Sequence, residues 1–94
     1  EQAQRLAKSL SAPNVLDYIE LSDEYGIIEM PVPESWLGKD LRQLNVRAKL
    51  GVSILAIRRG GKMHVSPAPD TAFIKEDILV VLGGSQALRK VQKL

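Results

Sequence analysis

The sequence predicts an α+β domain, in which a small sheet carries helices mainly on one side, in the order αα-β-α-β-β-β-α. An uninterrupted apolar run at 78–82, closed by Gly83 and Gly84, is typical of a central strand buried on both faces. Gly60 and Gly61 separate two further apolar stretches and indicate a hairpin. With 94 residues, of which 45% are hydrophobic, the chain has enough apolar surface for one small core.

The first part of the chain predicts two short helices. Apolar residues at helical spacing favour a helix over 2–10, and Asn14 is a good N-cap for a second helix that ends at Ile19. The chain starts without Met inside this helical pattern. We therefore expect residues 1–24 to be linker or crossover helices from a missing N-terminal domain, and residues 25–94 to form the domain proper.

A strand, a core aromatic and a basic helix follow. Ile28, Met30 and Val32 alternate with other residues, which is the period of a strand with one buried face. Trp36 is the single tryptophan, and we expect it in the core. Helical spacing of apolar residues predicts one helix from Lys39 that stops at Gly51; these apolar residues are Leu41, Leu44 and Ala48, with Val46 and Leu50 on an adjoining strip.

The last part of the chain predicts three strands and a final helix. A strand over 52–57 turns at 58–62 into a return strand that contains Met63 and Val65. A proline-rich loop over 66–70 and a connector over 71–77 lead to the central strand, and we expect Phe73 and Ile74 to point inward. Ser85 is then expected to cap a helix over 86–94, which buries Leu88 and Val91.

The charge is strongly divided along the chain. Residues 1–37 hold seven acids against two basic residues, whereas residues 39–62 hold seven basic residues against one acid. This middle segment predicts an anion-binding surface, in which Arg47 is suited to grip a phosphate through its planar guanidinium. A solvated basic helix face would give the same pattern, and residue types alone favour that reading.

Several kinds of site have no support in the sequence. The chain has no cysteine and a single histidine, His64, so we expect no metal site. Ser53 and Ser66 lack the context of a nucleophile, and Asp70, Glu76 and Asp77 are best explained by a solvated turn, so we expect no catalytic residues and no enzyme. Nucleotide-binding glycine motifs are absent. Aromatic residues are only 4% of the chain, which argues against nucleic acid as a partner.

Four motifs together resemble a known family. They are L-G-K-D-L-R-Q-L-N-V-R at 37–47, I-L-A-I-R-R at 54–59, S-P at 66–67 and D-I-L-V-V-L-G at 77–83. This order resembles the C-terminal regulatory domain of bacterial potassium-transport regulators, called RCK_C or TrkA-C, over about residues 25–94. The preceding segment is similar to the crossover of Ktr-type regulators, which favours a Ktr potassium uptake system over a cation/proton antiporter.

The resemblance implies a ligand and a set of residues that contact it. Ktr-type members bind cyclic di-AMP between two protomers, and the ligand lowers potassium uptake. Carried onto this chain, the ligand-binding positions are Leu41, Asn45, Val46, Arg47, Ser53, Ile54 and Pro67. In that arrangement Arg47 meets a phosphate, Asn45 reads the edge of the adenine, and the apolar members form a bed for the base. The family pattern often has an acid at Asn45 and Asn at Ser53, so these two contacts differ here.

The resemblance also implies partners and a location. We expect a homodimer within an oligomeric gating ring, bound to a membrane potassium-transporting subunit and therefore at the cytoplasmic face of the membrane. ATP or NAD is expected only on the missing N-terminal domain. The alternative is a structural dimerisation domain of a cation transport regulator, with no nucleotide ligand.

Overall fold

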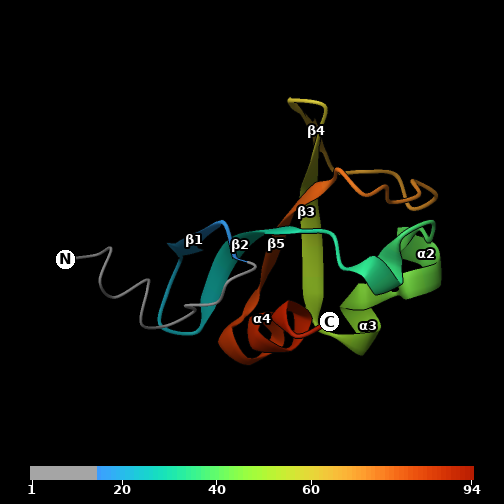
Figure 1. Cartoon of the computed structure of the whole chain (residues 1–94). Helices are drawn as coiled ribbons and strands as arrows, with labels where there is room; N and C mark the ends of the chain where they lie inside the picture. Colours follow the sequence, from blue (N-terminus) through green and yellow to red (C-terminus); the bar gives the residue numbers. More distant parts are fainter. Residues whose placement is uncertain (1–14) are drawn as a thin grey trace.

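The structure, a computed structural model, describes residues 15–94. They form one antiparallel sheet with the strand order β1-β2-β5-β3-β4, with helices beside it (Figure 1). The strands are β1 Asp17–Glu20, β2 Tyr25–Pro31, β3 Val52–Arg59, β4 Lys62–Val65 and β5 Ile78–Gly84. The helices are the 3-10 turn η1 Glu34–Trp36, α2 Leu41–Leu44, α3 Val46–Lys49 and α4 Ser85–Gln92. The predicted α+β class is confirmed.

β5 is the central strand, as its apolar run predicts. It pairs with β2 on one side and with β3 on the other, so none of its edge is open to solvent. Its two faces differ, however, because Leu79 and Val81 are buried whereas Val80 and Leu82 are only half-buried. The expectation of a strand buried on both faces is therefore wrong within residues 15–94, whose helices cover one face only.

β3 and β4 form the predicted hairpin. Arg59 pairs with Lys62 across a two-residue turn, in which Gly60 and Gly61 have φ values of 60° and 78°. Positive φ at both central positions defines the type I′ turn, whose twist matches that of the flanking strands. Glycine adopts positive φ without steric cost, so both residues suit the backbone of this turn.

The segment before β2 is a strand, so the prediction of a helix from Asn14 to Ile19 is wrong. Tyr18 pairs with Ile28 in the β1–β2 ladder, and this pairing with a distant strand overrides the local helical pattern. The helix predicted over 2–10 lies outside the described residues. The domain boundary at residue 24 stays a prediction.

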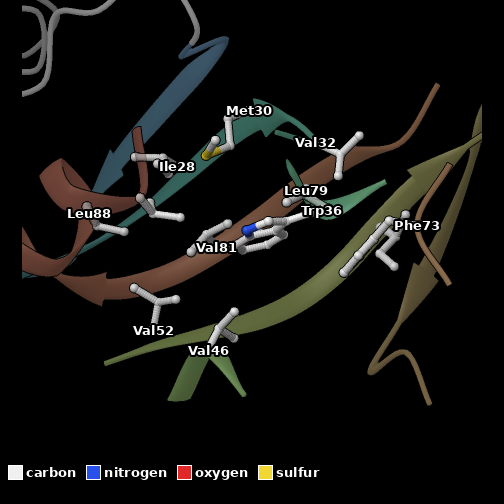
Figure 2. Packing of buried hydrophobic residues seen from close by; sticks show 12 residues of the cluster. Ile28, Met30, Val32, Trp36, Val46, Val52, Phe73, Leu79, Val81 and Leu88 are labelled. Carbon is white, nitrogen blue, oxygen red and sulfur yellow. The ribbon is translucent and has the colours of Figure 1, made fainter. Parts of the chain in front are cut away.

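The core lies between the sheet and the helices (Figure 2). Trp36 and Phe73 are buried as expected, and their ring centroids are 5.7 Å apart. Leu88 and Val91 of α4 are fully buried in the same cluster, together with alternate residues of β2 and β5. All these helical contacts fall on one face of the sheet, as predicted. Ile74 is exposed, which corrects its inward placement.

α4 begins one residue earlier than the sequence predicts with Ser85 as the N-cap. Gly84 is the N-cap and Ser85 is the first helical residue. The Ser85 backbone N–H donates to the Glu24 carbonyl oxygen at 2.9 Å, so the turn before β2 supplies an acceptor for this helix start. This hydrogen bond ties α4 to the β1–β2 turn.

Candidate functional site

The candidate site begins at α2, which a capping box fixes in place. The Asp40 carboxylate accepts from the Gln43 backbone N–H at 2.8 Å, and the Gln43 side-chain oxygen accepts from the Asp40 N–H at 3.1 Å. These reciprocal bonds satisfy two donors at the helix start. The Arg42 backbone N–H donates to the Pro69 carbonyl oxygen at 3.1 Å, so the loop after β4 is held against the same helix end.

Asn45 divides the basic helix in two. It has φ 48° and ψ 50°, a left-handed conformation that Asn tolerates better than most residues. α2 ends and α3 begins there, so the prediction of one continuous helix from Lys39 to Gly51 is wrong. The break turns α3 so that Val46 packs into the core whereas Ala48, predicted on the apolar stripe, is exposed.

The start of β3 supplies the opposite wall of the site. β4 pairs with β3 only from Ala56 onward, and the register between β3 and β5 shifts between Ile54 and Ala56. Ser66 has φ 53°, and its N–H donates to the Leu55 carbonyl oxygen at 2.8 Å, which turns the chain away from β3. Within the described chain, β4 therefore does not cover the edge of β3 before Leu55.

A cavity of about 400 Å³ lies between these walls. All seven residues that the family resemblance implies line it, from Leu41 in α2 to Pro67 in the loop. The cavity also has three lining residues that were not among the seven: Arg42, Ser66 and Pro69. The predicted set is thus brought together in space, and its role in ligand binding stays a prediction. Helical spacing in the sequence placed Arg42 on the helix. Nothing in the sequence indicated that the loop residues Ser66 and Pro69 would line the cavity.

The electrostatics of the cavity favour an anion. Among the residues that the structure describes, Arg42 and Arg47 are the charged ones that line it. Within residues 15–94, neither guanidinium has a hydrogen bond or an ion pair to a side chain, whereas Arg58 and Arg59 are both paired with acids. Unpaired guanidinium groups beside a half-apolar hollow suit a ligand that combines phosphate with a flat apolar group.

Asp77 lies outside the cavity, and its prediction as a solvated turn residue is wrong. Its carboxylate is fully buried and accepts from Arg59 Nε and Nη2, both at 2.7 Å, and from the Ile74 N–H at 2.9 Å. Burial raises the pKa of the Asp77 carboxyl, but the hydrogen bonds from Arg59 and Ile74 outweigh burial and hold that pKa below its ordinary value of 3.8. This pair fixes the connector before β5 to the end of β3.

The Asp77 pKa predicts acid sensitivity. Because the carboxyl pKa is lower in the folded state, the unfolded state binds more protons at low pH. The stability that Asp77 contributes is therefore present above pH 3.8 and is lost as the pH falls through its folded pKa. Urea unfolding between neutral pH and pH 2.5 should show this loss, and an Arg59→Leu/Asp77→Leu variant should show a smaller one. Equal pH dependence of both proteins would contradict the assignment.

The described residues also bear on metal binding and on membrane insertion. Among the residues that the structure describes, no group of histidine, aspartate or glutamate side chains could hold a metal ion. No helix within residues 15–94 is both long and apolar enough to cross a bilayer.

The fold and the site define a small domain of the α+β class, with a hollow at the end of a sheet. The TrkA-C domain family matches residues 27–94. The chain belongs to this family, and its resemblance to Ktr-type regulators is confirmed by the relatives below.

Two similar proteins are potassium-transport proteins. Ktr system potassium uptake protein A of Bacillus subtilis is 42% identical over 88 residues, which cover 94% of this chain and 40% of that protein. The chain thus spans about two fifths of the length of this relative. A solved structure of the RCK C domain of the potassium transport protein KtrA, in complex with cyclic diadenosine monophosphate, matches with a TM-score of 0.71 and 34% identity. That match covers 78% of this chain and 86% of the other.

A second solved domain is similar. The RCK_C domain dimer of S. agalactiae BusR, in complex with c-di-AMP, matches with a TM-score of 0.59 and 27% identity, over 69% of this chain and 92% of the other. The chain thus shares the TrkA-C domain fold with domains that have been solved in complex with cyclic di-AMP.

Proposed function

We propose that this domain binds cyclic di-AMP in a cleft between two copies of the chain, and that the bound ligand lowers potassium uptake. The observation that carries the proposal is the cavity with two unpaired arginines, lined by all the positions that the Ktr resemblance implies. The complexes of the KtrA and BusR domains with cyclic di-AMP support the choice of ligand.

Each part of the cavity suits one part of the ligand. Arg47 is exposed at the start of α3 and is free to donate two hydrogen bonds to a phosphate. Val46 is 4% exposed and forms an apolar floor, beside the half-buried Leu41 and Ile54, against which adenine packs. Asn45 is exposed at the helix break, where its amide both donates and accepts. The pocket thus offers one nucleotide subsite for each chain.

A two-fold ligand fits a two-fold pair of such subsites. Cyclic di-AMP has two identical halves, so a symmetric dimer needs only one copy of each contact per chain. Ligand binding then favours the arrangement of protomers in which the two cavities face each other. In the longer protein this bias is transmitted to a cytoplasmic gating ring and its potassium-transporting membrane subunit. ATP or NAD is proposed to bind only to the N-terminal domain of that longer protein.

Calorimetry tests the ligand directly. Titration of cyclic di-AMP into this chain should give micromolar or tighter binding, with one ligand for two chains. AMP can make only half of the contacts, because it does not reach the second subsite. Its affinity should therefore be lower by a factor of about 100 or more. A dissociation constant of about 1 mM corresponds to a binding free energy of only about −4 kcal/mol. If ligand at about 1 mM gives no heat of binding, the proposal is overturned, and a structural dimerisation domain is left as the function.

A further inference from the structure

Two guanidinium groups meet at the cavity, and no acid of the described chain lines it with them. Arg42 comes from α2 and Arg47 from α3, on opposite sides of the break at Asn45. Like charges at one hollow repel each other, and they raise the local concentration of anions. The pair of arginines therefore suits a ligand that brings more than one negative charge to each chain.

The fold fixes the backbone of Arg42 and leaves its side chain available. The Arg42 N–H donates to the Pro69 carbonyl oxygen at 3.1 Å, and both residues line the cavity. The side chain is exposed, and within residues 15–94 it has no hydrogen bond or ion pair, whereas both arginines of β3 are paired with acids. The five N–H donors of this guanidinium are thus free for a ligand.

The chemistry of phosphate separates the tasks of the two arginines. A phosphodiester, as in cyclic di-AMP, has two non-bridging oxygens and one negative charge, which one bidentate guanidinium satisfies. A phosphate monoester has three terminal oxygens and a charge of about −1.5 to −2 at neutral pH. Arg47 is therefore sufficient for a diester, and Arg42 gains a partner when the ligand ends in a monoester.

We propose that Arg42 is a second phosphate-binding residue, through which the cavity also accepts linear diadenosine nucleotides with a terminal phosphate. Such a ligand, pApA, differs from cyclic di-AMP by one water molecule. One P–O bond of the ring is open, so that one phosphate has a third terminal oxygen and one ribose has a free hydroxyl. Both bases still fill their subsites, and the terminal phosphate contacts Arg42 as well as Arg47. This inference rests on the proposed nucleotide site and extends its ligand class.

Calorimetry with a matched pair of ligands tests the role of Arg42. ApA has the same bases and the same linking phosphodiester as pApA but lacks the terminal phosphate. The wild-type chain should bind pApA more tightly than ApA. Arg42→Ala should lower this ratio of affinities about tenfold or more, because a hydrogen bond between charged groups contributes at least that much to affinity. Arg42→Gln, which removes the charge and keeps a polar side chain, should lower the ratio in the same direction.

The fold and the general effect of charge have their own controls. Arg42→Ala keeps the backbone N–H that bonds to Pro69, and alanine is the best helix former, so the circular dichroism spectrum should stay that of the wild type. Lys39→Ala removes an exposed cation near the start of α2 that lines a different hollow, beside Trp36. It should leave the ratio of affinities within about threefold of the wild type, as expected for a screened surface charge.

Cyclic di-AMP is titrated in parallel, because its binding decides the proposed function separately. If cyclic di-AMP binds but Arg42→Ala weakens pApA and ApA by the same factor, the nucleotide site stands and the role of Arg42 is overturned. The same holds if the wild-type chain binds pApA no more tightly than ApA. If cyclic di-AMP does not bind but the ratio falls in Arg42→Ala, the proposed ligand is wrong and Arg42 is a phosphate-binding residue.

Discussion

Replacement of Arg59 with leucine is expected to lower the free energy of unfolding by about 3–5 kcal/mol. The substitution removes two hydrogen bonds of 2.7 Å to Asp77 and one of 3.0 Å to the Ala72 carbonyl oxygen. It leaves the fully buried Asp77 carboxylate with the Ile74 N–H at 2.9 Å as its remaining partner. At about 0.05–0.15 kcal/mol per residue, a domain of this size has a total stability of only about 5–14 kcal/mol. Urea unfolding followed by circular dichroism should therefore show a large shift of the midpoint.

The neighbouring arginine gives a matched control. Arg58 pairs with Glu29 at 3.0 Å, but its side chain is 40% exposed, and such surface pairs contribute about 0–1 kcal/mol. Arg58→Leu should therefore cost less than about 1 kcal/mol. The double variant Arg59→Leu/Asp77→Leu should recover most of the lost stability, because it removes the unpaired charge. If Arg59→Leu proves no more destabilising than Arg58→Leu, the Asp77 pair does not hold the connector as described.

The sheet could be predicted where its signals are local. The apolar run of β5 and the two glycines of the β3–β4 turn each specify their conformation within a few residues. β1 could not be predicted in this way, since its strand conformation depends on the pairing of Tyr18 with Ile28. Asp77 was misplaced for the same reason: its partner, Arg59, is 18 residues away, and neighbouring acids suggested a solvated turn.

The candidate site was predictable in part. Residue types alone indicated an anion near Arg47, and only the family resemblance indicated the uncharged positions such as Leu41 and Pro67. The break at Asn45 was missed because the apolar spacing continues through it, although Asn is one of the few residues that accept a left-handed conformation. That break sets the direction of α3, and so it places Arg47 at the cavity.

Replacement of Arg47 with alanine is expected to weaken cyclic di-AMP binding by a factor of 100 or more. A hydrogen bond to a charged group contributes about 1.5–3 kcal/mol, and the two-fold ligand would lose one such contact in each chain, or about 3–6 kcal/mol in total. Arg47 lines the cavity without an intramolecular partner for its side chain within residues 15–94, so its removal should leave the fold intact. Calorimetry measures the affinity, and thermal unfolding checks the fold.

Two further substitutions separate a phosphate contact from a general effect of charge. Lys49→Ala removes a cation two residues away that does not line the cavity, so it should change the affinity by less than about threefold, as expected for a screened surface charge. Arg47→Lys keeps the positive charge but loses the bidentate geometry of the guanidinium. The affinity of this variant should therefore lie between that of the wild type and that of Arg47→Ala. If Arg47→Ala and Lys49→Ala lose the same amount of affinity, the ligand responds to the overall positive charge of α3. Arg47 then makes no specific hydrogen bond to the phosphate.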